Sequence, residues 1–81
     1  MIERNDIEKG IRSGIRDLII LAVQKAGKTR EQIEERMPEI KFGILKHPDM
    51  IVFMQEARLT EDDSIKLINE AVDGVLAETE W

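Results

Sequence analysis

The chain has no cysteine, which excludes both disulfide bonds and thiolate metal sites. Its single histidine, His47, has no second histidine within ligand spacing, so we expect no transition-metal site and place His47 at a helix end. A chain of 81 residues without cross-links depends on one hydrophobic core or on a partner subunit for its stability. The absence of cysteine is also typical of a reducing, cytoplasmic setting.

Long hydrophobic runs are absent as well. The longest, Leu18–Val23, is far shorter than the roughly 20 residues that cross a bilayer. The first residues, Met1–Asp6, lack the basic patch and the apolar stretch of a signal peptide. We therefore expect a cytoplasmic protein with no membrane partner.

Motifs of catalysis are missing too. No glycine-rich phosphate loop is present, and nothing in the sequence places a histidine base beside Ser13 or Ser64. The acidic run Glu61–Asp63 cannot surround one cation, because consecutive helical residues point to different sides, and helix capping explains it better. Acid–base catalysis by paired carboxylates needs a pocket that shifts a pKa, for which so small a core has little room. We expect a protein that is not an enzyme and takes no cofactor and no small-molecule substrate.

What the chain does have is the composition of one folded domain, with 42% hydrophobic and 36% charged residues. Its formal net charge of -5 comes from one part of the sequence. Residues 25–47 contain six basic and four acidic residues, whereas residues 48–81 contain nine acidic residues against two basic ones. An anionic partner would therefore meet the first half of the chain, because the C-terminal part repels it.

Helix signals begin near the N-terminus. Asn5 followed three residues later by Glu8 is a capping-box pattern, and it predicts a helix start. Apolar residues then recur every three to four positions, and Gly27 stands where a helix commonly ends in the left-handed conformation. We expect a first helix of about six turns.

Two features of this first helix concern its neighbours. Leu18–Val23 is apolar around the whole circumference, so it is either the central helix of the fold or also buries a face against a second subunit. From this we hypothesise a homodimer. Gly10 and Gly14 could let another backbone approach closely, although the same spacing also arises by chance.

The middle of the chain predicts two short helices. Thr29 with Gln32 repeats the capping-box pattern and opens a helix that Pro38 ends. Pro38 also suits the first position of the next helix, Glu39–Lys46.

Two more segments complete the chain. Met50–Ala57 is ambiguous, because its apolar run Met50–Met54 could be a buried strand, but no partner strand exists elsewhere and we interpret it as helix. Thr60 caps a last helix whose first turn is acidic.

These signals predict an all-α fold, a compact helix-turn-helix-like bundle of four to five helices in a single domain spanning residues 1–81. We expect ten residues in its core: Ile15, Leu18, Ala22, Ile33, Met37, Leu45, Phe53, Ile65, Ile68 and Val72. Ser64, Lys66, Glu70 and Asp73 are expected on the solvent side of the last helix.

One segment, Ala26–Met37, has a recognisable pattern: a helix ending in Ala-Gly, a threonine cap and a short helix. It resembles the lambda-repressor-like (Cro/repressor) helix-turn-helix family, and the resemblance covers about residues 15–68. It implies that the second helix lies across the DNA backbone and that the third enters the major groove. Under this resemblance the phosphate contacts would be Lys28, Thr29 and Arg30, and the residues facing base edges would be Lys41, Phe42, Gly43 and Lys46.

The sequence is consistent with two functions. The first is a DNA-binding transcriptional regulator that binds duplex DNA as a dimer, which the basic residues between Lys25 and Lys46 favour. The second is an acidic helical protein-interaction module, such as an inhibitor, an antirepressor or a mobile-element accessory protein, which the acidic tail favours. The face presented by residues 41–46 has no Asn, Gln or Arg to read bases and shows Phe42 instead. Such a residue is typical of a protein-binding anchor, unless it is buried in the chain's own core.

Overall fold

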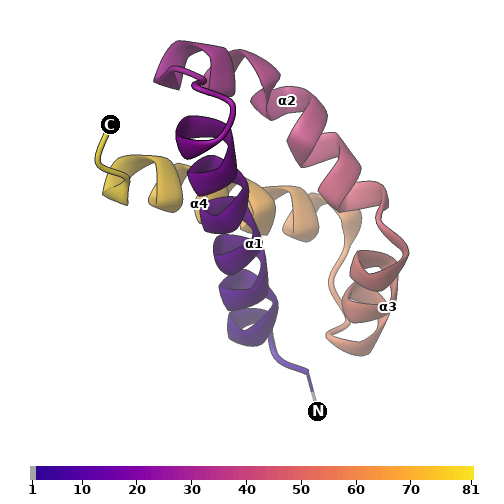
Figure 1. Cartoon of the computed structure of the whole chain (residues 1–81). Coiled ribbons are helices and arrows are strands. Elements are labelled where there is room, and N and C mark those ends of the chain that lie inside the picture. The colour runs from indigo at the N-terminus through magenta and orange to yellow at the C-terminus, as the bar shows by residue number, and fades with distance from the viewer. Residues whose placement is uncertain (1) are drawn as a thin grey trace.

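The computed structural model describes residues 2–81 and places them in four α-helices (Figure 1). These are α1 (Arg4–Gln24), α2 (Arg30–Lys46), α3 (Pro48–Glu56) and α4 (Glu61–Glu78). Within residues 2–81 there is no strand, and the ambiguous stretch Met50–Met54 is helical. The predicted all-α bundle of four to five helices is confirmed. No helix in this range is long and apolar enough to span a membrane.

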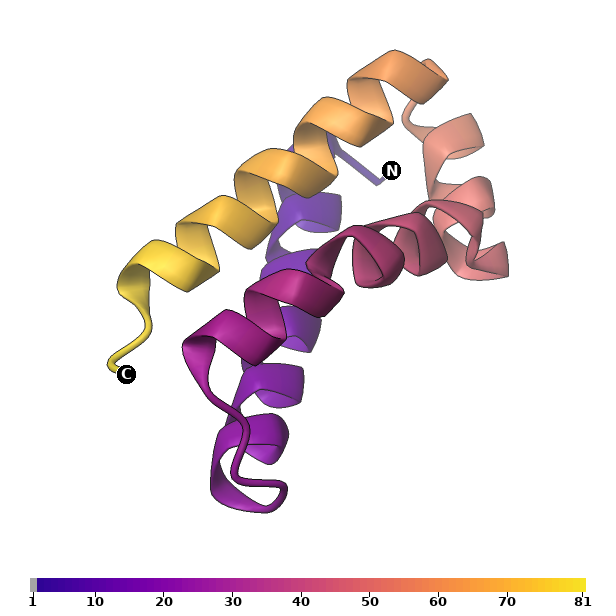
Figure 2. The ribbon, with the colours of Figure 1, turned by 90° about the horizontal axis from the view of Figure 1, so that it is seen from above.

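The central helix of the bundle is α4. It crosses α1 and also contacts α2, while α3 packs on α2, as two views of the ribbon show (Figures 1 and 2). Leu67, Ala71 and Val72 of α4 have 0% of their surface exposed, so this helix is covered on its inner side along most of its length. Of the apolar run Leu18–Val23 only Ile19 is buried, so the alternative that this run forms the central helix is wrong.

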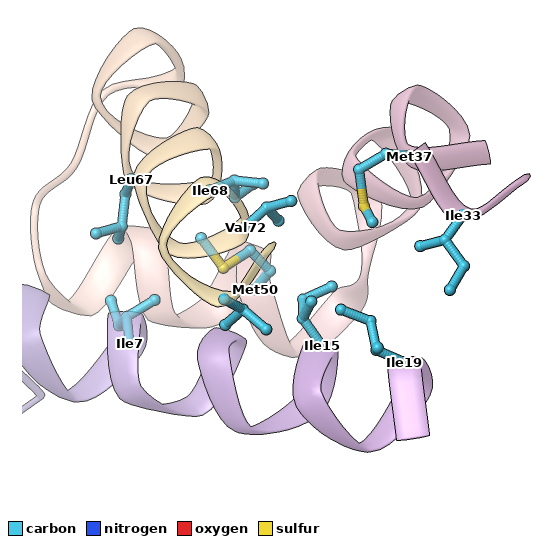
Figure 3. Close-up of a cluster of buried hydrophobic side chains, with 10 residues drawn as sticks. Ile7, Ile15, Ile19, Ile33, Met37, Met50, Leu67, Ile68 and Val72 are labelled. Atoms are coloured by element: carbon cyan, nitrogen blue, oxygen red, sulfur yellow. The ribbon is translucent and has the colours of Figure 1, made fainter. Parts of the chain in front are cut away.

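The core is built from one apolar stripe on each helix (Figure 3). Isoleucines of α1 face the stripe of α4, the side chains of α2 close one end, and Met50 of α3 reaches in between. The buried hydrophobic residues are Ile7, Ile15, Ile19, Ile33, Met37, Met50, Leu67, Ile68, Ala71, Val72 and Val75. Burial of such side chains, at about 1.5–3 kcal/mol each, is the main source of stability in a chain without cross-links.

Two of the ten predicted core residues are exposed, and a residue expected on the surface is buried. Leu18 is 37% exposed and Ile65 is 39% exposed, whereas Ser64 is fully buried. The inward stripe of α4 begins one residue earlier than predicted, because Ser64 lies in line with Ile68 and Val75 at helical spacing. The Ser64 hydroxyl donates to the carbonyl of Thr60 at 2.9 Å, so its burial leaves no unpaired polar group. Of the other predicted core residues, Ala22, Leu45 and Phe53 are only partly buried.

Most helix ends follow local sequence. Thr29 and Thr60 are N-cap residues, as predicted, and each forms a capping box with the residue three positions later. Gly27 has a φ of 63°, the left-handed conformation expected after α1. The predicted cap at Asn5 is wrong, because α1 starts at Arg4 and the Asp6 carboxylate accepts the N–H of Glu3 at 3.1 Å.

The predicted break at Pro38 is also wrong. α2 runs without interruption from Arg30 to Lys46 with Pro38 inside it. Proline leaves the carbonyl four residues earlier, that of Glu34, without its helical hydrogen bond. Both residues are exposed, so water can satisfy that carbonyl. Ile33 and Met37, each one residue earlier, are buried on the adjacent inner face, and this packing holds the helix together across the proline.

Candidate functional site

The residues expected to contact phosphate lie at the start of α2. Thr29 acts as the N-cap of this helix, with its Oγ1 accepting a backbone N–H of the first turn at 3.3 Å. Arg30 donates to Glu34 Oε1 at 2.9 Å, and its guanidinium lies 5.5 Å from the centroid of the Trp81 ring. Lys28, in the preceding loop, lines a hollow between α1 and α2. Thr29 and Arg30 are thus engaged within the chain itself.

The residues expected to face base edges lie in the second half of α2, where Lys41 and Phe42 line one hollow against α4 and Gly43 does not. Lys41 Nζ is 3.9 Å from Asp73 Oδ1 on α4. Phe42 is 62% exposed, so it is not a core residue, and Lys46 Nζ lies 5.7 Å from the centroid of its ring. Gly43 belongs to another surface, because it lines a groove shared with α1. The seven predicted residues therefore do not form one face.

The basic residues of α2 are largely compensated by nearby carboxylates. In addition to the pairs made by Arg30 and Lys41, Arg36 Nη1 lies 3.7 Å from Glu39 Oε2. Such exposed pairs contribute little to stability, but they reduce the positive potential that an anionic partner would meet.

A groove that the sequence did not predict separates α1 from α2 and α3. It has a volume of about 580 Å³. It exists because α1 packs mainly on α4, while α2 and α3 pack on each other at the far side. The α1 wall is lined by Asp6, Ile7, Gly10, Ile11, Gly14, Ile15 and Leu18, and the opposite wall by Ile40, Gly43, Ile44, His47, Asp49, Met50 and Phe53. Apart from Asp6, His47 and Asp49, both walls are apolar.

Three glycines stand on these walls in the interior of helices. A methyl group added at Gly10, Gly14 or Gly43 would meet no neighbouring atom within 4 Å, so internal packing does not require glycine there. At Gly74, by contrast, the added carbon would lie 2.6 Å from Arg12 Nη1. Each interior glycine costs about 0.5–1 kcal/mol relative to alanine. Two sequence signals touched this surface: the paired spacing of Gly10 and Gly14, and Gly43 among the predicted contact residues.

The two carboxyl groups with displaced pKa values lie outside the groove. Glu78 accepts hydrogen bonds from Arg12 and from Arg16, the latter at 3.1 Å, and these bonds lower its pKa. The hydrogen bonds that Asp63 exchanges with Thr60 at the start of α4 lower the pKa of Asp63. Glu78 joins the end of α4 to α1, and Asp63 belongs to the capping box at the start of α4. Both displaced pKa values therefore follow from the fold. Within residues 2–81 no three His, Asp or Glu side chains gather as a metal site.

Comparison with models of known protein families, with curated proteins and with solved structures finds no match. The geometry of the groove is thus the main evidence on function.

Proposed function

We propose that this protein is a protein-interaction module whose groove binds an α-helix of a partner protein. The observation that carries the proposal is the lining of the groove, which is apolar on both walls and has glycine on both walls. Along α1 it extends from Ile7 to Leu18, about 17 Å or three helical turns at 1.5 Å per residue. A groove of this kind suits an amphipathic helix that inserts apolar residues at helical spacing.

Glycine on both walls favours a docked α-helix over an extended peptide or a small molecule. Without side chains at Gly14 and Gly43, the backbone of a docked helix can approach closely, as small residues allow in other helix pairs. Each leucine or isoleucine that the partner buries contributes about 1.5–3 kcal/mol before the costs of association.

The geometry supports the DNA-binding hypothesis less well. That hypothesis needs a turn between two short helices, whereas α2 continues through Pro38. It also uses basic residues to contact the DNA, and two of the four predicted ones, Arg30 and Lys41, lie beside a carboxylate. An exposed Phe42 beside Lys46 is closer to a protein-contacting surface than to a reader of base edges.

A binding measurement with a matched pair of variants tests the proposal. The probe is a fluorescent, leucine-rich synthetic amphipathic helix of about 15 residues, followed by anisotropy. Gly14→Leu places a side chain in the groove, and Ser13→Leu adds the same side chain to an exposed position of α1 outside it. We expect wild type and Ser13→Leu to bind alike, and Gly14→Leu to bind at least about tenfold more weakly. Absence of binding by wild type, or equal loss in both variants, would overturn the proposal.

A parallel titration with labelled duplex DNA at low salt separates the two functions. We expect no binding that follows the steep salt dependence of phosphate neutralisation. Salt-dependent binding that Arg30→Ala weakens for all sequences alike would favour the DNA-binding function instead.

A further inference from the structure

A second hollow adjoins the groove along α1, and different charged residues line the two hollows. This second hollow, between α1 and α2, has a volume of about 520 Å³ and shares Leu18 and Ile40 with the groove. Taken together, the apolar residues of α1 that line the two hollows extend from Ile7 to Ala22. At 1.5 Å per residue that is about 22 Å, or roughly four helical turns.

The end near α3 is acidic. Asp6, in the first turn of α1, and Asp49, in the first turn of α3, both line it. The imidazole there, His47, accepts the N–H of Asp49 through Nδ1 at 3.1 Å. Within residues 2–81 neither carboxylate has a lysine or arginine nitrogen within 4.0 Å. These two carboxylates are the negative charges that a partner would meet.

The opposite end carries more positive than negative charge. The second hollow is lined by Lys28 and Arg36, with Glu35 as its one carboxylate. Arg36 lies 3.7 Å from Glu39, an exposed pair that lowers the positive potential at Arg36, so Lys28 contributes most of the positive charge at this end. The charged residues that line the two hollows therefore change from two carboxylates at the α3 end to two basic residues and one carboxylate near the loop that joins α1 to α2.

From this polarity we infer the chemistry and direction of the partner, given the proposed function of the groove. The partner is an amphipathic helix of another protein, with carboxylates at its N-terminal end and lysines or arginines at its C-terminal end. Its cationic end lies between Asp6 and Asp49, and its acidic end lies beside Lys28 and Arg36. This is also the charge order that the dipole of a helix favours. The bound helix therefore runs antiparallel to α1 and parallel to α2.

Two synthetic helices with the same leucine face test the charge preference. The polarised peptide has Glu in its first turn and Lys in its last turn, and the acidic peptide has Glu at both ends. We expect the polarised peptide to bind wild type about tenfold more tightly. Replacing both Asp6 and Asp49 by Asn should remove that difference, whereas Asp17→Asn with Asp62→Asn, at exposed positions outside the groove, should keep it.

A nitroxide at the C-terminus of the polarised peptide tests the direction. In NMR spectra of the complex, we expect paramagnetic broadening of the Asp49 amide and little broadening of the Lys28 amide. The opposite pattern overturns the inferred direction. Equal affinity for both peptides overturns the charge preference while the proposed function stands, and failure of both peptides to bind removes the proposed function itself. Dimerisation of wild type that Gly14→Leu abolishes would assign the groove to a second copy and overturn the inference.

Discussion

Pro38→Ala should stabilise the protein, because Pro38 lies inside a continuous helix. The ring removes one backbone hydrogen bond in the middle of α2, and alanine restores the missing N–H toward the Glu34 carbonyl. Since Pro38 is exposed, the substitution removes no core contact.

The magnitude follows from two opposing effects. Proline is less favourable than alanine by about 3 kcal/mol in a helix interior. Replacing proline also increases the conformational freedom of the unfolded chain, which lowers the free energy of unfolding of the variant by about 0.4–1 kcal/mol. We therefore expect the free energy of unfolding to rise by about 2 kcal/mol, and Tm to rise by about 8–16 °C in a domain of this size.

The other proline of the chain is a matched control. Pro48 is the first residue of α3, where proline needs no N–H and its fixed φ suits the helix. Pro48→Ala should therefore be neutral or destabilising. Urea and thermal unfolding followed by circular dichroism would measure both variants. If Pro38→Ala instead lowered stability, as expected for a turn at residues 38–39, the continuous α2 would be refuted.

Three further predictions concern other parts of the fold. Gly14→Ala should raise the free energy of unfolding by about 0.5–1 kcal/mol in urea titrations, because the site has room and the helix gains propensity, whereas Gly27→Ala, at a φ of 63°, should lower it. Glu78 has a native pKa below its ordinary value of 4.5, so the stabilisation from its bonds to Arg12 and Arg16 is present above that value and is lost as the pH falls through the native pKa. Glu78→Gln should flatten this part of the stability–pH curve in urea titrations, and an unchanged curve would contradict the assignment. The homodimer remains a prediction, supported by Leu21, which is 52% exposed. Sedimentation should show a dimer that Leu21→Lys disrupts. A wild-type monomer at high micromolar concentration would contradict the homodimer.

The candidate site was the least predictable part of the molecule. The residues of α2 were selected by their charge and by a family pattern, yet Gly43 lines the groove with α1, whereas Lys41 and Phe42 line a hollow against α4. Neighbours in a helix differ in direction by about 100°, so which of them share a surface depends on where the other helices pack. A groove between α1 and α3 joins residues about 40 positions apart, and no local pattern encodes that juxtaposition.

The sequence by itself determined that the chain is helical and where most of the helices begin. The caps at Thr29 and Thr60 and the left-handed residue Gly27 involve atoms within a few residues of each other, so local chemistry was enough. The tertiary structure decided that α2 passes through Pro38, because Ile33 and Met37 are held in a common core. It also decided that Ser64 and not Ile65 faces inward, and that α1 and α3 stand apart. These outcomes depend on how four amphipathic helices share one small core, which is a property of their packing together and of no single segment.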